Sequence, residues 1–189
     1  MVQGAASRTG HGADVDLRFL VARAQEGDRA ALEELYLVHF DRVYGYLYVT
    51  AGNRDDAEDL TTQTFLRMLE SIGRFRWQSS PFSGWLLRIA HNLAVDHFRA
   101  QQRMQVEPDV PEREGEPSVE SEALGSIGQF GMLELIDRLS PEQRQVLTLK
   151  FLFGFGNAET AGILGKSEGA VKSLQHRALA SLEKQLVRS

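Results

Sequence analysis

The chain has 189 residues, of which 42% are apolar and 25% charged, a composition typical of a soluble globular protein with one domain or two small ones. It contains no cysteine, which excludes disulfides, zinc–thiolate sites and thiol nucleophiles. No apolar run approaches ~18 residues and the first residues lack a signal-peptide core, so we expect no transmembrane helix and a cytoplasmic location.

The charge is distributed unevenly along the chain. The net charge of −5 argues at first against nucleic-acid binding. Residues 104–128, however, carry seven acids and one Arg, whereas residues 141–189 carry seven bases and four acids. Because charges are screened within ~10 Å, the local excess decides which partner a surface attracts. The basic C-terminal part is therefore compatible with DNA.

Residues 1–103 predict a helical domain behind a short tail. We expect residues 1–13 to be disordered because they are Gly-rich and polar, and the first domain to span 14–103. Apolar residues spaced three or four apart predict helices at about 16–25, from about 32 to Gly52, and at 54–71. An aromatic loop, 73–80, precedes a helix that begins at Ser80-Pro81 and runs to about 103. No alternating apolar pattern predicts a strand.

Residues 104–128 are rich in Glu and Pro, and cannot bury enough apolar surface to fold, so they predict an acidic flexible linker. The second domain, 129–189, begins with a short amphipathic helix from Phe130 to Leu139. Ser140, with Pro and Gln143 after it, predicts a capping box for a helix that ends at Gly154. The sequence thus predicts an all-α protein of two small helical domains joined by a tether.

Residues 157–177 have the pattern of a helix-turn-helix. Small Ala161 falls where two helices press together, and Gly165 falls in the turn, where positive φ is required. Ser167 is placed to cap the second helix, and Val171 lies on its inner face. In such motifs the second helix enters the DNA major groove. A compact helical pair without a DNA function has a similar pattern.

The two domains together resemble the extracytoplasmic-function group of the sigma-70 family, the promoter-specificity subunits of bacterial RNA polymerase. The resemblance covers about residues 16–103 and 129–187. In the first domain it rests on the segments 56–60, 64–67, 82–86, 88–92 and 96–99. In the second it rests on 139–143 and 169–173.

The resemblance implies that the acidic helix at 55–70 docks on the β′ coiled coil of core polymerase. With the apolar stripe turned inward, acidic side chains stay exposed and suit a basic partner helix, although a solvated helix start has the same charge pattern. The implied core-binding residues are Asp55, Asp56, Asp59, Leu60, Gln63 and Arg67. Thr62 and Gln63 stand where the family commonly has Gln-Glu.

The resemblance further implies that the aromatic loop and the helix after it open the −10 element and hold its unpaired strand. Aromatic rings stack on unpaired bases at ~1–3 kcal/mol per base, and arginines pair with phosphates. The apolar residues of the helix, such as Phe82 and Leu86, are expected in the core. The implied −10 residues are Phe75, Arg76, Trp77, Arg88, His91, Asn92, Arg99 and Arg103.

For the −35 element, the resemblance points to the start and outer face of the second helix of the helix-turn-helix, with Lys172 and Arg177 as the principal contacts. Asn157 is expected to cap the first helix. The implied −35 residues are Lys166, Ser167, Glu168, Gly169, Lys172, Ser173, His176 and Arg177.

Implied partners are core RNA polymerase through its β′ coiled coil and β flap, promoter DNA, and an anti-sigma factor. The acidic linker is expected to pass toward the RNA exit channel, but a plain solvated linker explains its acidity equally well. A LuxR-like regulator with a C-terminal helix-turn-helix is the alternative, although it leaves segment 56–60 and the aromatic loop unexplained. An enzyme is disfavoured, since the sequence has no phosphate loop or metal-ligand pattern, and we expect no cofactor or metal.

Overall fold

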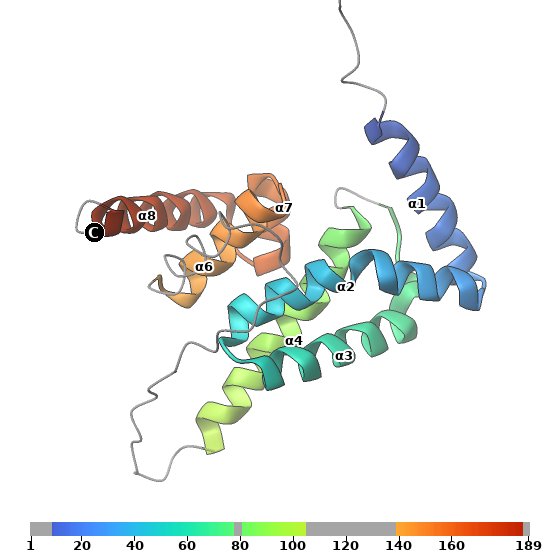
Figure 1. Ribbon diagram of the computed structural model, residues 1–189, viewed down its shortest axis with the longest axis horizontal. Helices are drawn as coiled ribbons and strands as arrows, with labels where there is room; N and C mark the ends of the chain where they lie inside the picture. Colours follow the sequence, from blue (N-terminus) through green and yellow to red (C-terminus); the bar gives the residue numbers. More distant parts are fainter. Residues whose placement is uncertain (1–8, 78–80, 105–138, 187–189) are drawn as a thin grey trace, which may run out of the picture.

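The computed structural model describes residues 9–77, 81–104 and 139–186, and within these ranges it contains helices and no strand. The predicted all-α class is confirmed (Figure 1). The predicted linker and the helix expected at 130–139 fall almost wholly outside the described residues. The elements are α1 Thr9–Gln25, α2 Arg29–Ala51, α3 Arg54–Ser71, η1 Ile72–Arg74, α4 Phe82–Met104, α6 Pro141–Leu147, η2 Thr148–Leu152, α7 Asn157–Leu164 and α8 Glu168–Leu186.

Helices α2 and α3 are bounded by local capping signals. Asp28 accepts from the backbone N–H groups at the start of α2, and Gly52 ends that helix at φ 73°. Asn53 then caps α3 through the N–H of Asp56. Each cap satisfies backbone groups that a helix end leaves unpaired, at a typical gain of ~1 kcal/mol. The helices expected up to Gly52 and at 54–71 end where the sequence predicts.

Helix α1 begins at Thr9, several residues before the start predicted near residue 16. Gly10 and Gly12 lower the helix propensity of this segment, which favours a later start. Propensity is a weak prior, and these two glycines lie inside a helix that continues to Gln25. Residues 9–13, which the sequence assigns to a disordered tail, therefore belong to α1.

The C-terminal helices also begin and end at capping residues. Ser140 and Gln143 form the predicted capping box at the start of α6, and Gly165 ends α7 at φ 61°. Between them, residues 148–152 form a π-helix, which the sequence did not indicate. Asn157 is not the cap of α7. The cap position is Gly156, whose N–H donates to Glu159 (2.8 Å), while Asn157 accepts from Lys150 (2.6 Å).

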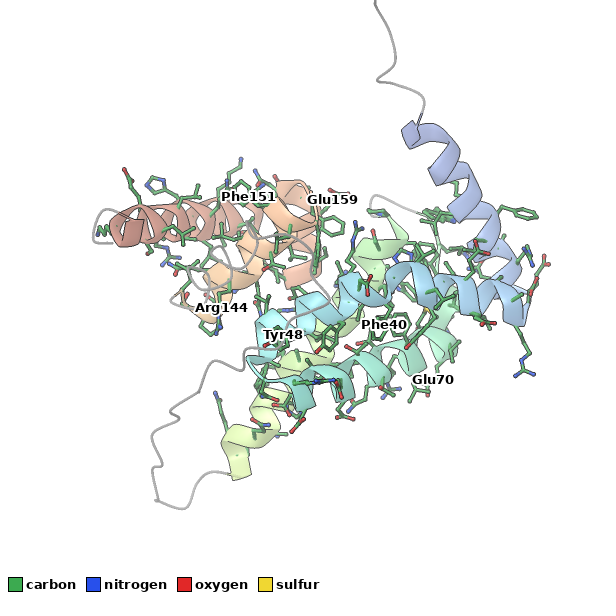
Figure 2. The ribbon with its side chains drawn as sticks, viewed as in Figure 1. Phe40, Tyr48, Glu70, Arg144, Phe151 and Glu159 are labelled. Atoms are coloured by element: carbon green, nitrogen blue, oxygen red, sulfur yellow. The ribbon has the colours of Figure 1, made fainter. Side chains whose placement is uncertain are left out.

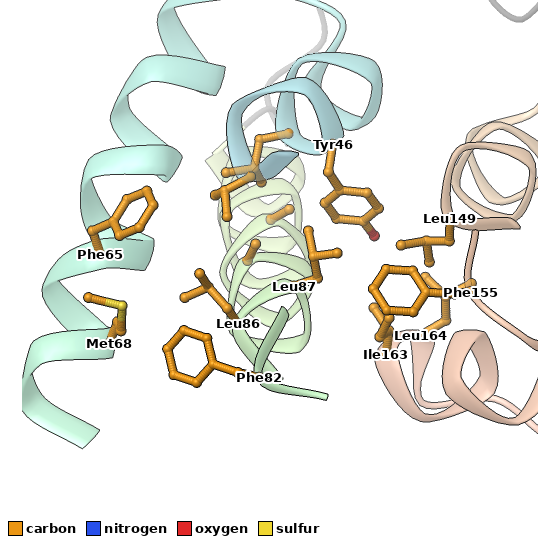
Figure 3. Packing of buried hydrophobic residues seen from close by; sticks show 14 of the residues in the cluster. Tyr46, Phe65, Met68, Phe82, Leu86, Leu87, Leu149, Phe155, Ile163 and Leu164 are labelled. Carbon is orange, nitrogen blue, oxygen red and sulfur yellow. The ribbon is translucent and has the colours of Figure 1, made fainter. Parts of the chain in front are cut away.

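The two sets of helices share one continuous hydrophobic core (Figure 3). Helix α4 packs against α2 and α3 on one side and against α7 on another. Tyr46 and Leu87 from the first set lie opposite Leu149, Phe155 and Leu164 from the second. Each fully buried side chain of this size contributes roughly 1.5–3 kcal/mol. The contact is therefore a packed interface between the N-terminal and C-terminal helices.

A cation reinforces this interface. The guanidinium of Arg42 on α2 lies 5.5 Å from the ring centroid of Phe153 and 6.0 Å from that of Phe155. Burial lowers the pKa of Arg42 from its ordinary value, but arginine stays protonated over any physiological range. A cation over aromatic faces away from water stabilises by roughly 1–2 kcal/mol.

Candidate polymerase-binding and DNA-binding surfaces

The acidic face of α3 is partly as the sequence predicts. Asp55 and Asp59 are exposed, and Asp59 accepts a hydrogen bond from Gln63 (2.7 Å) on the next turn. Arg67 is exposed and pairs with Glu70 (2.9 Å), near the end of α3 farthest from α6–α8 (Figure 2). Leu60 is 1% exposed and lies in the core, so its assignment as a surface contact is wrong. The physical reason is that the buried stripe of α3 includes its position.

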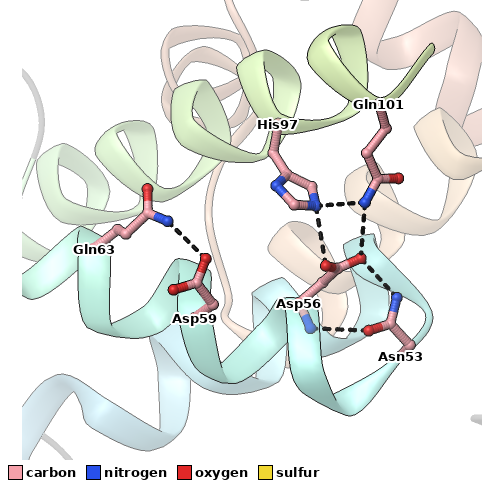
Figure 4. Close-up of polar contacts among 6 residues, drawn as sticks. All are labelled: Asn53, Asp56, Asp59, Gln63, His97 and Gln101. Carbon is pink, nitrogen blue, oxygen red and sulfur yellow. Dashed lines mark hydrogen bonds and ion pairs between the residues drawn. The ribbon is translucent and has the colours of Figure 1, made fainter. Parts of the chain in front are cut away.

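Asp56 is held by three residues around it (Figure 4). Its carboxylate lies 3.0 Å from His97 Nε2 on α4 and accepts from Asn53 (2.8 Å) and, more weakly, from Gln101 (3.5 Å). Burial opposes ionisation, but these hydrogen bonds and the His97 charge outweigh it and lower the pKa of Asp56. Asp56 therefore ties α3 to α4, and its side chain is only about a fifth exposed.

The segment 72–77 turns its first aromatic ring inward. Phe75 is 6% exposed and contacts the rings of Phe82 and Trp85 at about 5 Å. Its assignment as a base-stacking residue is wrong, because its ring completes the core between α3 and α4. Trp77 is half-buried, and its ring meets that of Phe75 at 5.2 Å. Arg76 is exposed and donates back to the loop carbonyls of Gly73 and Phe75.

Helix α4 exposes four of its five predicted DNA contacts: Arg88, Asn92, Arg99 and Arg103. The fifth, His91, is buried against α7, so its assignment as a −10 contact is wrong. Its Nδ1 lies 2.9 Å from the hydroxyl of Tyr46, and its ring also bonds the backbone of Leu164. Burial and the nearby charge of Lys166 lower the pKa of His91. The residue is part of the contact between the two sets of helices.

A cleft of about 600 Å³ lies between α4 and the C-terminal helices. Asn92, Asp96 and Arg99 line it from α4, and Glu142 and Lys166 from the other side. Of the predicted −10 residues that are exposed, Asn92 and Arg99 thus face the C-terminal helices across the cleft. The ion pair between Lys166 and Glu142 (2.7 Å) fixes one wall of it.

The helix-turn-helix has the predicted inner and outer faces. Val171, Leu174 and Ala178 are buried, and Ser167 caps α8 by accepting from the N–H of Ala170 (3.2 Å). The start and outer face of α8 carry the exposed residues. These are Ser167, Glu168, Gly169, Lys172, Ser173, His176 and Arg177. Lys166 is only partly exposed because it pairs with Glu142.

Contacts between side chains on one helix and residues of another segment are not predicted by the sequence. Gln25 on α1 donates to the carbonyls of Ile72 and Phe75, both at 2.9 Å, and Arg18 lies over the ring of Trp77. A groove of about 310 Å³ between α2 and α3, lined by Tyr36, Phe65 and Leu69 among others, was also not indicated. Helical periodicity reports which face of one helix is apolar, and it carries no signal for such contacts.

Within the described residues there is no group of three or more His, Cys, Asp or Glu side chains that would hold a metal ion. The same part of the chain has no helix long and apolar enough to cross a membrane.

Comparison with known proteins gives matches over both sets of helices. The family described as Sigma-70 region 2 matches residues 21–104, and the one described as Sigma-70, region 4 matches residues 130–182. The ECF RNA polymerase sigma factor BldN of Streptomyces coelicolor is 43% identical over 171 residues, which are 88% of this chain and 64% of that protein. The chain thus spans less than two thirds of that relative's length.

Two further matches agree. The ECF RNA polymerase sigma factor SigD of Mycobacterium tuberculosis is 31% identical over 175 residues, covering 89% of this chain and 82% of that protein. The sigma factor RpoE of Bartonella quintana, solved with the anti-sigma factor NepR, has a similar fold (TM-score 0.69, 22% identity), covering 82% of this chain and 95% of that one. The chain belongs to the ECF RNA polymerase sigma factors of the sigma-70 family.

Proposed function

We propose that this chain is a promoter-specificity subunit, which binds core RNA polymerase in the cytoplasm and directs initiation at promoters with its own −35 and −10 elements. The observation that carries the proposal is the combination of an exposed acidic α3 with a helix-turn-helix whose outer face is polar and basic. Matches to regions 2 and 4 of one family, in the order that family has them, support the same reading.

Core polymerase docks on the exposed face of α3 in this proposal. Asp55, Asp59, Gln63 and Arg67 are the accessible side chains of that face. Opposite charges at the rim of an interface mainly raise the association rate and select the partner. Asp56 takes part indirectly, because its bonds to Asn53 and His97 fix the start of α3 against α4.

Promoter DNA is contacted by two separate surfaces. The exposed basic side chains of α4, together with Arg76 and Trp77, hold the unpaired strand of the −10 element. The exposed face of α8 enters the major groove of the −35 element, with Lys172 and Arg177 as its principal cations. Lys166 contributes only where its ion pair with Glu142 opens.

An anti-sigma factor is a further proposed partner. The similarly folded RpoE of Bartonella quintana was solved with such a protein, NepR. The cleft between α4 and the C-terminal helices is a surface of mixed charge that remains accessible for such a partner. For the LuxR-like alternative, α3 and the segment 72–77 would have no role.

Titration of the purified chain against core RNA polymerase, beside its binding to duplex DNA alone, tests the proposal. We expect saturable binding to core and promoter-selective DNA binding only in the holoenzyme. Tight, specific duplex binding by the free chain without any affinity for core would instead establish a conventional regulator.

A further inference from the structure

Helix α1 is bound to the segment that the proposed function places at the unpaired −10 strand. Figure 1 shows α1 alongside the chain that leaves α3, and the two are in contact. The amide of Gln25 donates to Ile72 O and to Phe75 O, each at 2.9 Å, and so bridges the two ends of a short turn. Within that turn the N–H of Phe75 donates to Ile72 O (3.0 Å).

The two carbonyls that Gln25 binds belong to a turn in which Ile72 and Phe75 are both buried. Phe75 is buried, so its backbone lies beside the core, where an unpaired carbonyl costs roughly 1–3 kcal/mol. Arg76 supplies a second donor to Phe75 O from the outside. The position of Trp77, two residues further on, is therefore fixed from α1 as well as by its own ring contact with Phe75.

Arg18 changes what the face of Trp77 offers to a ligand. Its guanidinium carbon lies 4.9 Å from the centroid of the Trp77 ring, while the Arg18 side chain is exposed. The edge-to-face contact with Phe75 takes a further part of the Trp77 ring. The indole ring thus carries a cation on a side chain that is itself exposed to solvent.

We propose that Arg18 is a nucleotide-binding residue, and that the guanidinium layered on Trp77 forms the platform on which an unpaired base of the −10 strand stacks. A guanidinium plane is a stacking surface for bases, and its charge adds a cation–π component. Trp77 is the lower layer of this platform, and Gln25 is the positioning residue that holds the segment beneath it. The inference rests on the proposed −10 role of the segment 72–77.

The experiment uses holoenzyme assembled from purified core polymerase and the full-length chain. The probe is a promoter fragment selected by transcription with that holoenzyme, with the −10 region either paired or pre-melted by mismatches. Dissociation constants for the pre-melted fragment are measured at several salt concentrations for Arg18→Ala, Arg18→Lys, Gln25→Leu and Trp77→Ala. Arg23→Gln is the matched control, since it removes one positive charge from the same helix. In the unaltered chain Arg23 bonds Asp28 and not the segment 72–77. Circular dichroism melts confirm that each variant folds.

We expect Arg18→Ala to weaken binding to the pre-melted fragment roughly 5- to 20-fold, at the lower end of what one stacked base contributes. Arg18→Lys should be nearly as weak, because it keeps the charge but loses the plane. Gln25→Leu should also weaken binding, by about 3- to 10-fold as for one or two lost hydrogen bonds, with faster amide exchange at Phe75 in the free chain. Arg23→Gln should bind as the unaltered chain does.

Three results would contradict the proposal, each in a different way. Full recovery by Arg18→Lys, with a salt slope lowered by ~0.7 in Arg18→Ala, would make Arg18 a phosphate contact and overturn the stacking platform. Loss of binding in Trp77→Ala but not in Arg18→Ala would also overturn the inference while leaving the −10 role of the segment intact. If both variants bind the pre-melted fragment normally, the −10 role itself is wrong and the inference falls with it.

Discussion

Acidification from about pH 7 to about pH 5 should destabilise the N-terminal helices through His39 on α2. This imidazole is 5% exposed, contacts the ring of Phe82 at 5.2 Å, and its Nε2 has no hydrogen-bond partner among the described residues. Burial, with a smaller contribution from the charge of Arg42, lowers the pKa of His39 from 6.5 to about 4. The folded protein therefore keeps His39 neutral at a pH where the unfolded chain protonates it.

The direction and the size of this loss of stability follow from proton linkage. Between pH 6.5 and about 4 the unfolded state binds more protons, so the free energy of unfolding falls as the pH falls. With 1.36 kcal/mol per unit of pKa difference, the loss is about 2 kcal/mol at pH 5 and on the order of 3 kcal/mol below pH 4. Asp28 and Asp56 have lowered pKa values, so they remain ionised at pH 5 and contribute only in more acidic solution.

Urea unfolding at pH 7 and pH 5, for the unaltered chain and for His39→Leu, measures this loss. Leucine fills an apolar site without titrating, so the variant should lose about 2 kcal/mol less than the unaltered chain over the same interval. His91, whose pKa is also lowered, titrates in both proteins and cancels in the comparison. Equal losses in the two proteins would mean that the fold does not hold His39 in its neutral form.

Three further predictions concern the proposed polymerase and DNA surfaces and the packing between the two sets of helices. Asp59→Arg should weaken binding to core polymerase about tenfold in a pull-down titration with an unchanged circular dichroism spectrum, whereas equal affinity would remove α3 from the interface. In holoenzyme, Lys172→Ala should weaken the binding free energy by ~1–3 kcal/mol at one −35 position, whereas Arg177→Ala should lower the salt slope by about one without changing base preference. Binding to −35 variants at two salt concentrations measures both effects, and the reverse outcome would exchange the roles of the two residues. Phe155→Ala should reduce the free energy of unfolding in urea by about 3 kcal/mol, because this residue is 6% exposed and packs between the two sets of helices. A loss under about 1 kcal/mol would mean that the interface is loosely packed.

Local signals in the sequence predicted most helix boundaries. Gly52 and Gly165 adopt the positive φ expected of a residue that ends a helix, and Ser140 forms the expected capping box. These motifs act within four or five residues, so a single sequence contains all the information they need. The π-helix at 148–152 has no comparable local signature.

The site was predicted less well because its residues are arranged by contacts between distant segments. A helical pattern identifies one buried stripe, but α4 is buried on two sides, and His91 lies on the second. Phe75 was assigned to DNA because it stands in a loop, whereas its ring fills the core beside Phe82. The sequence does not indicate the contact of Arg18 with Trp77, because the two residues are far apart in the chain.

Transcription from a library of genomic fragments, with purified core RNA polymerase in the presence and absence of this chain, measures whether the chain selects promoters. We expect discrete transcripts that depend on the chain, that share upstream −35 and −10 elements, and that weaken with Asp59→Arg. Transcripts that are identical with and without the chain, while the folded chain binds core, would contradict its proposed role in promoter selection.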